Sequence, residues 1–365
     1  MRLFLCGDVM TGRGIDQILP YPSDPQIFEP YVKDAGEYVM LSELLYGTIS
    51  RPVDFNYIWG DAVDIWELMQ PDFKIANLET AVTSSNEAWP DKEINYRMNP
   101  GNVECLSRAG FGCCTLSNNH VIDWGYSGLL ETLSSLHKNG IETAGAGVNL
   151  EEATAPYIRD FGEKGRIIVL SMGMETSGIP PEWGATDKKP GIFLTDGLES
   201  QLKSFLLPVY LNKKPQDLLV VSIHWGLNWV NDIPGQHMEL AHLLVDTFKA
   251  DIVHGHSSHH ALGIEIYKGH LILYGCGDFI TDYEGISGYE NFRGDISLMY
   301  FADIDKRGEL QDLTIFPLQM RKFQLSHLCA EDRKWIENAL NLWGKVFGTR
   351  VIQNQNCFKL QWKRK

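Results

Sequence analysis

The sequence predicts an α/β protein with two mixed sheets. Short apolar or β-branched runs alternate with helical patterns along the chain, and each of the first three runs stops at polar residues. Later runs follow one another through short turns such as Lys268-Gly269, which is typical of antiparallel strands. Because 44% of the 365 residues are hydrophobic and 22% are charged, the chain can bury a substantial core, and disorder and fibrous repeats are excluded.

The N-terminal half is expected to alternate strand and helix. Strands are predicted over residues 3–6, 73–76 and 112–116. Helices are predicted over residues 60–70, 102–109 and 127–138, because Asn99-Pro100 precedes the second and Asn139-Gly140 ends the third. In open α/β sheets the polar ends of such strands meet along one edge, where ligands bind.

The C-terminal half continues the alternation and then becomes richer in strands. Strands are predicted over residues 166–171, 217–223, 252–254, 261–266, 271–274 and 296–301, and helices over 199–211, 235–248 and 330–343. No internal repeat and no linker rich in Pro, Gly and Ser divides the chain. We therefore expect one domain over residues 1–320, with an insertion at about 15–60, followed by a C-terminal helix and tail over 321–365.

The charge balance restricts the kind of partner. The chain has 32 Lys and Arg against 47 Asp and Glu, a net charge of −15, so nucleic acid and anionic membranes are not expected partners.

No run approaches the roughly 18 apolar residues of a membrane helix, and the apolar stretch at residues 3–6 is too short for a signal peptide. Seven cysteines without a CxxC pair favour reduced thiols. A cytoplasmic protein without direct membrane insertion is predicted.

Polar residues that can bind metals follow the apolar runs. They are Asp8, Glu79, Asn119, His120, His224, His256 and His259. Carboxylates can bridge two cations, an amide oxygen adds a neutral ligand, and imidazoles complete the set while leaving a position for water. The sequence therefore indicates a metal centre at the strand ends.

Each of these residues also has a structural interpretation when taken alone. Asp8 could form a turn, Glu79 could be an exposed loop acid, and Asn119 with His120 could cap a turn. His224 follows a largely apolar run and could be a buried, hydrogen-bonded histidine. Four of the eleven histidines fall within the seven residues 254–260, a density that favours metal binding.

Six short motifs in order resemble one family. They are Gly7-Asp8-Val9-Met10, Ala76-Asn77-Leu78-Glu79, Asn118-Asn119-His120, His224-Trp225-Gly226, Gly255-His256-Ser257-Ser258-His259 and Gly275-Cys276-Gly277-Asp278-Phe279. Over about residues 2–285 the chain resembles the CapA family, the capsule and poly-γ-glutamate biosynthesis proteins related to calcineurin-like metallophosphoesterases. The resemblance implies a four-layer α/β/β/α sandwich.

The resemblance also implies a role for each candidate residue. Asp8 and His259 would bind a first metal, Glu79 would bridge, and His120 would donate a proton. Asn119, His224 and His256 would bind a second metal. One or two divalent ions, Mn, Fe or Zn, are implied.

Three positions depart from the pattern of the metallophosphoesterases and of this family. Met10 stands where metallophosphoesterases carry a histidine, and Glu79 stands where they carry the bridging aspartate. Ser258 stands where the CapA family has proline.

The implied function is hydrolysis by metal-activated water, of a phosphoester or of a γ-glutamyl bond in an anionic substrate. His120, Asp8 and Arg13 would be catalytic, and Arg13, Arg97 and Trp225 would contact a small or terminal anionic group. The alternative is a non-catalytic subunit that binds an anionic polymer for a synthesis or export complex. Either reading allows partner proteins of polymer synthesis.

Overall fold

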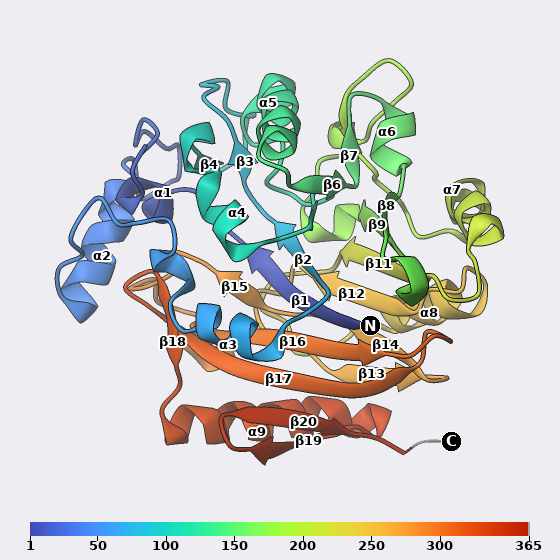
Figure 1. Cartoon of the computed structure of the whole chain (residues 1–365). Helices are drawn as coiled ribbons and strands as arrows, with labels where there is room; N and C mark the ends of the chain where they lie inside the picture. The colour runs from blue at the N-terminus through green and yellow to red at the C-terminus, as the bar shows by residue number, and fades with distance from the viewer. Residues whose placement is uncertain (364–365) are drawn as a thin grey trace.

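Two sheets lie face to face, and helices cover their outer faces (Figure 1). The computed structural model describes residues 1–363. One sheet has ten strands and the other six, and both contain parallel and antiparallel pairs. The predicted α/β class and the four-layer α/β/β/α sandwich are therefore confirmed.

The ten-stranded sheet has the order β19-β20-β17-β16-β1-β2-β5-β6, with β15 beside β1 and β18 beside β17. Its parallel part consists of β1 (Arg2–Val9), β2 (Phe73–Leu78), β5 (Cys113–Thr115), β6 (Glu142–Ala144) and β15 (Asp278–Ile280). Its antiparallel part consists of β16 (Ile296–Ile304), β17 (Leu310–Arg321), β18 (Gln324–His327), β19 (Arg350–Asn354) and β20 (Cys357–Gln361).

The six-stranded sheet has the order β13-β14-β12-β11-β9-β8. Its four central strands are parallel: β9 (Arg166–Gly173), β11 (Leu218–His224), β12 (Ile252–His256) and β14 (His270–Leu273). Its antiparallel edge strands are β8 (Tyr157–Asp160) and β13 (Ile264–Tyr267). The predicted strand over 261–266 therefore begins later, because Ala261 instead forms an isolated bridge with Cys276.

Alternating side chains along β1 separate two hydrophobic cores. Leu3 and Leu5 face the six-stranded sheet, whereas Phe4 and Cys6 face the helices on the other side. In β11, Val220 belongs to the core between the sheets and Val221 to the core under the outer helices. Strands buried on both faces are apolar throughout, which is why these runs could be recognised in the sequence.

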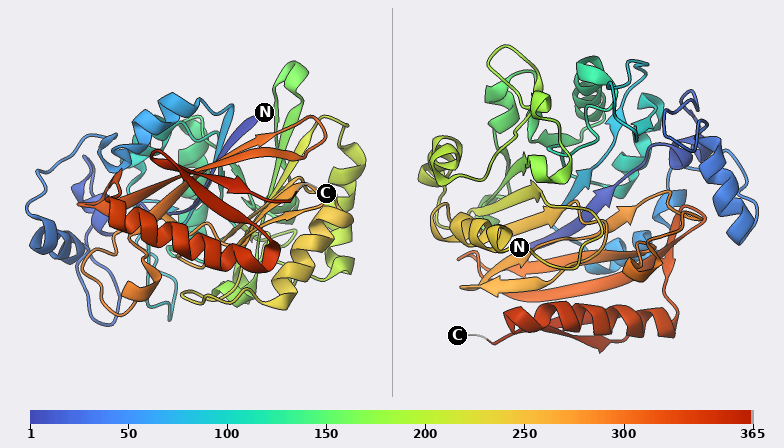
Figure 2. Two further views of the ribbon diagram at one scale, coloured as in Figure 1. Left: turned by 90° about the horizontal axis from the view of Figure 1, so that it is seen from below. Right: turned by 180° about the vertical axis from the view of Figure 1, so that it is seen from behind.

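Two groups of helices cover the outer faces of the sheets (Figure 2). The ten-stranded sheet carries α3 (Ala62–Met69), α4 (Glu104–Ala109) and α5 (Gly125–Lys138), and the six-stranded sheet carries α7 (Glu199–Asn212) and α8 (Gly235–Asp246). In the first group, the ring of Trp66 meets Phe4 edge-on at 5.4 Å. The predicted helix over 102–109 is split, since Pro100–Asn102 forms a 3₁₀ turn before α4.

The remaining elements are short or peripheral. The helices are α1 (Gly14–Ile18), α2 (Gly36–Tyr46) and α6 (Leu150–Thr154), and two small sheets pair β3 (Ala81–Val82) with β4 (Arg97–Met98) and β7 (Ala146–Gly147) with β10 (Gly191–Ile192). Within residues 1–363, no helix is both long enough and apolar enough to cross a membrane.

The C-terminal segment is built onto the ten-stranded sheet. The helix α9 (Ala330–Gly344), predicted over 330–343, buries Ile336 and Leu340 against the core between the sheets. The hairpin of β19 and β20 joins β17 through the pair Ile315 and Phe358. Figure 2 shows α9 and this hairpin side by side. The division of the chain at residue 320 stays a prediction.

Candidate metal centre

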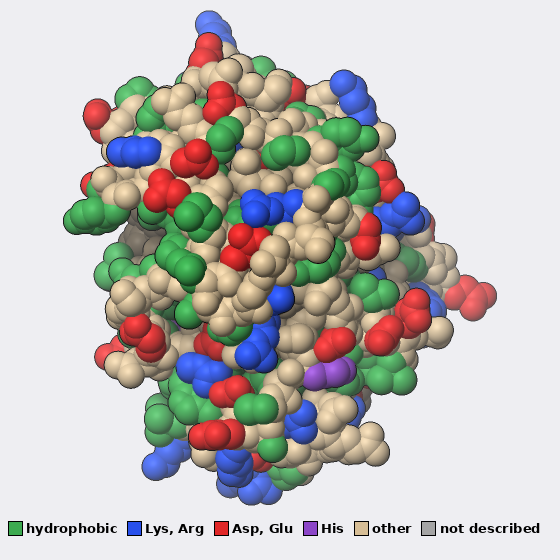
Figure 3. All heavy atoms as spheres, turned by 90° about the vertical axis from the view of Figure 1, so that its left-hand side faces the viewer, with side chains coloured by type: hydrophobic (Ala, Val, Ile, Leu, Met, Phe, Trp, Pro, Cys, Tyr) green, Lys and Arg blue, Asp and Glu red, His purple; other side chains and the backbone are tan. Residues whose placement is uncertain are grey.

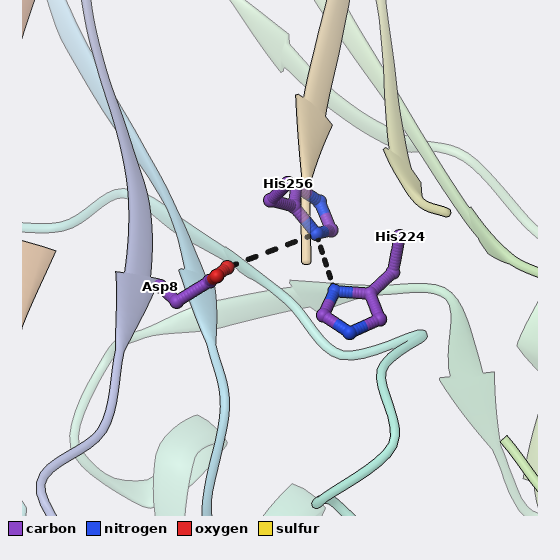
Figure 4. A group of neighbouring side chains, drawn as sticks. All are labelled: Asp8, His224 and His256. Atoms are coloured by element: carbon purple, nitrogen blue, oxygen red, sulfur yellow. Dashed lines mark hydrogen bonds and ion pairs between the residues drawn. The ribbon is translucent and has the colours of Figure 1, made fainter. Parts of the chain in front are cut away.

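The candidate metal ligands meet where strands of the two sheets end. Asp8 lies in β1, and Glu79 directly follows β2. His224 and His256 are the last residues of the neighbouring strands β11 and β12, where they are register partners. Asn119 follows β5. Figure 4 shows the side chains of Asp8, His224 and His256 directed toward one another.

A close backbone approach places Asp8. The register of β1 shifts between Cys6 and Asp8 against β2, and between Asp8 and Val9 against β15. Such irregularities change the direction of a side chain at the end of a strand. At Gly7 a Cβ atom would lie 1.8 Å from the carbonyl oxygen of Gly277, so only glycine fits.

The turn after β12 brings two histidines to Asp8. Ser257 and His259 have φ angles of 97° and 59°, in the left-handed region, so the chain reverses within a few residues. His256 Nδ1 lies 4.0 Å from Asp8 Oδ1, and His259 Nδ1 lies 3.8 Å from Asp8 Oδ2. The spacing of three residues is thus sufficient for both imidazoles to reach one carboxylate.

The other candidate ligands surround His224. Its Nδ1 lies 2.7 Å from His256 Nδ1, and its Nε2 lies 3.0 Å from Asn119 Oδ1 and 4.0 Å from Glu79 Oε1. The structure therefore brings together all six residues for which the sequence predicted metal binding, namely Asp8, Glu79, Asn119, His224, His256 and His259. Their role as ligands stays a prediction.

A third carboxylate, Asp278, completes the cluster. It begins β15 and is the register partner of Asp8, and its Oδ1 lies 2.8 Å from His259 Nδ1. Asp8, His259 and Asp278 offer ligand atoms within 4.8 Å of one another, and so do Asp8, His224 and His256. The sequence motif contained Asp278, but no role was predicted for it because its neighbours are distant in sequence.

The electrostatics of these residues favour a bound cation. Burial raises the pKa of Asp8, and burial together with Asp8 and Asp278 raises the pKa of Glu79 well above its usual value. Burial also raises the pKa of Asp278 to about 7, although His259 opposes this shift. For His224, burial lowers the pKa well below its usual value, which keeps the imidazole neutral. Burial likewise lowers the pKa of His256 well below its usual value, whereas Asp278 and Asp8 raise the pKa of His259 against the effect of burial. Crowded acids and imidazoles are the donor set of a divalent metal site.

Two unpartnered atoms support this conclusion. Glu79 Oε1 and Asp278 Oδ2 are buried and have no hydrogen-bond partner within the described part of the chain. Asn77 Nδ2 donates to Asp8 Oδ1 at 2.8 Å and to the other oxygen of Glu79 at 3.1 Å, so it orients both carboxylates. Buried carboxylate oxygens without donors are costly unless a cation is bound. The residues present therefore fit one or two divalent ions.

The predicted proton donor His120 lies beside this cluster. Its Nε2 is 3.8 Å from Glu79 Oε1, and its Nδ1 is 2.6 Å from Asp123 Oδ2. Lys92 Nζ contacts Asp123 and lies 3.0 Å from His120 Nδ1. Burial lowers the pKa of His120 to about 4. Sequence reasoning missed Asp123 and Lys92. Asp123 lies only three residues after His120, a spacing that could have drawn attention to it.

Met10, which stands where metallophosphoesterases carry a histidine, is fully buried. Its sulfur accepts a hydrogen bond from the hydroxyl of Tyr283 at 3.6 Å. The side chain therefore offers the cluster no hard donor, and Asp278 is the additional oxygen donor beside His259.

Arg13 is buried in a network of its own. Its Nε donates to Asp282 at 3.1 Å, and its Nη1 donates to Glu29 at 2.8 Å and to the hydroxyl of Tyr38 at 3.1 Å. A second ion pair joins Arg13 Nη2 to Asp282. Arg13 lines the pocket described below, as expected, but its charge is balanced by two buried carboxylates.

The structure does not bring Arg97 and Trp225 to that pocket. The Arg97 guanidinium donates to the carbonyl oxygens of Ser85 and Asp24, each at 2.8 Å, because β4 directs it to these loops. Trp225 Nε1 donates to the carbonyl oxygen of Tyr274 at 2.9 Å, so its ring packs in the core under α8. Trp229, four residues later, lines the pocket instead.

An open pocket of about 1370 Å³ leads to the cluster. It reaches Asn119 and His259 at its inner end, and its walls come from segments 29–46, 93–94, 226–229 and 281–295. Aromatic and aliphatic side chains make up much of these walls, among them Tyr31, Leu227 and Tyr289. Asn119 and His259 therefore connect the cluster of candidate ligands with this pocket.

The chain is similar in sequence to two named proteins and in fold to one solved structure. A probable polyglutamine synthesis accessory protein of Mycobacterium tuberculosis is 40% identical over 355 residues, which cover 96% of this chain and 93% of that protein. The PGA biosynthesis protein CapA of Bacillus subtilis is 29% identical over 228 residues, 60% of this chain and 57% of that protein. The crystal structure of a phosphatase from Mycoplasma pneumoniae has a TM-score of 0.48 over 87% of this chain and 93% of that one, with 12% identity.

The family described as bacterial capsule synthesis protein PGA_cap matches residues 2–283. The match contains all six motifs that carried the resemblance to CapA proteins. That resemblance is confirmed, and the chain belongs to the PGA_cap family of bacterial capsule synthesis proteins.

Proposed function

We propose that the protein is a metal-dependent hydrolase that cleaves a phosphoester or a γ-glutamyl bond in an anionic substrate. One observation carries the proposal: seven oxygen and imidazole donors lie beside the pair of His120 and Asp123, and two of these donors, Asn119 and His259, line an open pocket. A binding protein has no need of a histidine oriented by a carboxylate at that place.

The donors divide into two neighbouring groups. Asp8, His259 and Asp278 would hold one ion, and Asn119, His224 and His256 would hold another, with Glu79 between the two groups. Asp8 also offers a ligand atom close to those of His224 and His256. Manganese, iron and zinc suit this mixture of oxygen and nitrogen donors. A bound ion of this kind supplies a Lewis acid and a water molecule whose pKa is lowered toward neutrality.

In its imidazolium form, which burial opposes and Asp123 favours, the side chain of His120 would transfer the proton of Nε2 to the leaving atom. Asp123 accepts at Nδ1, which fixes the orientation of the ring and turns Nε2 toward Glu79 and the cluster. Lys92 in turn contacts Asp123 and the carbonyl oxygen of Asn119, which holds this segment in place. Asn77 keeps Asp8 and Glu79 oriented throughout.

The names of the relatives connect this activity with capsule or poly-γ-glutamate metabolism. One is named a polyglutamine synthesis accessory protein and another a PGA biosynthesis protein. We therefore propose proteins of polymer synthesis as partners.

We also propose the cytoplasm as the location. All seven cysteines are free, and six of them are buried, as expected in a reducing compartment.

The accessory role named for the M. tuberculosis relative favours a second candidate function. In that case the protein would bind an anionic polymer for a synthesis or export complex without cleaving it. The same pocket would then bind the polymer, and His120 would not take part in catalysis.

Metal analysis combined with a substrate screen tests the proposal. The full chain, loaded with Mn²⁺, Fe²⁺ or Zn²⁺, is assayed on aryl and alkyl phosphoesters and on γ-glutamyl peptides. We expect bound metal and turnover of one of the two substrate classes. Bound metal without turnover of any of them, together with tight binding of γ-glutamyl oligomers, would support the binding subunit instead.

A further inference from the structure

The walls of the pocket lack an unpaired cation. Among the described residues that line it, Arg13 and Arg293 are the two arginines, no lysine is present, and His259 belongs to the candidate metal ligands. Arg13 is paired with Asp282 and Glu29. Arg293 donates to Asp295 at 2.7 and 2.9 Å and to Asp332 at 2.7 Å. Neither guanidinium is therefore available to an anionic ligand without loss of an existing ion pair.

Acidic side chains outnumber these cations. The lining carboxylates are Glu29, Glu93, Glu284, Glu290 and Asp295. Glu93 and Glu290 are exposed, and neither has an ion-pair partner within residues 1–363. A second anionic group placed beside them would be repelled. The metal cluster is thus the place in this pocket that favours negative charge.

Exposed apolar side chains surround the entrance. Tyr31 is 96% exposed, Leu227 68%, Tyr289 46% and Ile286 38%, and all four line the pocket. The ring of Trp229 stacks on Tyr289 at 4.8 Å and on His259 at 5.3 Å, so the apolar surface continues from the entrance to the metal cluster. Apolar side chains that gather around a pocket mark a surface that is covered when a ligand binds.

We propose that the pocket binds the non-reacting part of the substrate as an uncharged aromatic or aliphatic group, while one anionic group lies at the metal cluster. This inference rests on the proposed function and adds to it the substrate class. The anion would be recognised by the bound metal. The apolar group would be recognised by Leu227, Ile286 and the ring of Tyr289, because burial of apolar surface is favourable.

Three non-hydrolysable probes separate the two parts of the site. Methylphosphonate carries the anion alone, phenylphosphonate adds an apolar ring, and 4-carboxyphenylphosphonate adds the ring and a second charge. Their dissociation constants are measured by calorimetry on the full chain loaded with Mn²⁺. We expect phenylphosphonate to bind about tenfold more tightly than methylphosphonate, and the carboxylated probe to bind about fivefold more weakly than phenylphosphonate.

Variants assign this preference to the pocket. Leu227→Ala and Tyr289→Ala should each remove most of the gain from the phenyl ring, and the methylphosphonate affinity should change less than twofold. Leu211→Ala is the matched control, because Leu211 is 70% exposed on α7 and does not line the pocket. Glu93→Gln and Glu290→Gln should each reduce the discrimination against the carboxylated probe.

The outcomes distinguish this inference from the proposed function. Equal affinity for methyl- and phenylphosphonate in a protein that binds metal would overturn the inference alone. Tighter binding of the carboxylated probe would also overturn it and would indicate a groove for an anionic polymer. Absence of metal binding would overturn the proposed function and the inference with it, whereas absence of phenylphosphonate binding to the metal-loaded protein would overturn the inference alone.

Discussion

At the scale of single residues, His224 lies at the centre of the second group of donors, since its two nitrogens face His256 and Asn119. His224→Ala removes one nitrogen donor from a buried site, so we expect the metal content and the turnover to fall together while the fold is retained. Elemental analysis and circular dichroism of the purified variant check this prediction. An unchanged metal stoichiometry would show that His224 is not a ligand.

A second residue, His120, contacts the donors through Glu79 without belonging to either group. His120→Ala should keep its metal and lose turnover by about 10²-fold to 10⁴-fold, as expected for a general acid. The loss should shrink for substrates with good leaving groups, because these need no proton. A loss that is equal for all leaving groups, or a loss of metal, would contradict the assignment.

Hydrogen bonds behind the ligands set their orientation. Ser222 Oγ lies 2.8 Å from His256 Nε2, which leaves Nδ1 toward Asp8 and His224. Ser222→Ala should therefore weaken metal binding by about 10-fold to 100-fold, the usual effect of losing a partner behind a ligand. Metal titration measures the effect. Ser297→Ala, at a buried serine bonded to the carbonyl oxygen of Phe279, is the control and should leave the affinity unchanged.

The residues also show where sequence reasoning reached its limit. Asp8, Glu79 and His256 could be predicted because each follows a strand that is recognisable by itself. Asp278 could not, because it reaches the cluster only through the pairing of β15 with β1, which lie far apart in sequence. Trp225 and Trp229 both follow β11, and only the packing of Trp225 under Tyr274 and His237 decides which of them lines the pocket.

At the scale of elements, the close approach of β1 to Gly277 fixes the distance between β1 and β15, the strands that carry Asp8 and Asp278. Gly7→Ala would place a methyl group within 1.8 Å of the Gly277 carbonyl oxygen, so β1 and β15 must separate. We expect unfolding free energy to fall by about 3 kcal/mol and metal binding to weaken. Denaturant unfolding measures the first effect. Gly235→Ala, where a methyl group meets nothing within 4 Å, should change stability by less than about 0.5 kcal/mol.

The packing of α8 on the end of β11 should depend on pH. His237 of α8 stacks on Trp225 at 4.6 Å, and burial lowers its pKa to about 4. The unfolded state takes up a proton near pH 6.5 but the folded state only near pH 4, so this histidine reduces stability as the pH falls between these values.

The expected loss at His237 is roughly 2 kcal/mol at pH 5 relative to pH 7. His237→Phe keeps the stacking and removes the titration, so its stability should fall less steeply over this range. Denaturant unfolding at several pH values compares the two proteins. Parallel curves would contradict the interpretation.

Strands that are buried on both faces could be predicted from the sequence. Strands that are held mainly by pairing with distant segments of the chain could not. The apolar run that became β11 is recognisable without any neighbour, because both of its faces are buried. The hairpin of β19 and β20 has mostly exposed side chains in β19, and it is held by its pairing with β17 and by α9. Such pairing between distant segments leaves no local pattern in the sequence.

At the scale of the whole molecule, charge opposes the binding of a long polyanion. The net charge is −15, and Figure 3 shows basic and acidic side chains interspersed on the face that carries α2, without a continuous basic track. Within the pocket, the described cations are already paired. Attraction of a polyanion over a long path would require an unpaired basic surface.

A series of γ-glutamyl oligomers of increasing length tests this expectation. If only a terminal group enters the site, affinity should not rise with length beyond two or three residues, because further carboxylates stay in solvent or are repelled by the acidic surface. The affinity of the long oligomers should then change little between low and moderate salt, since a binding site without unpaired cations releases few counterions. Affinity that continues to rise with length, and that falls steeply with salt, would show an extended groove for the polymer and would favour the binding subunit over the hydrolase.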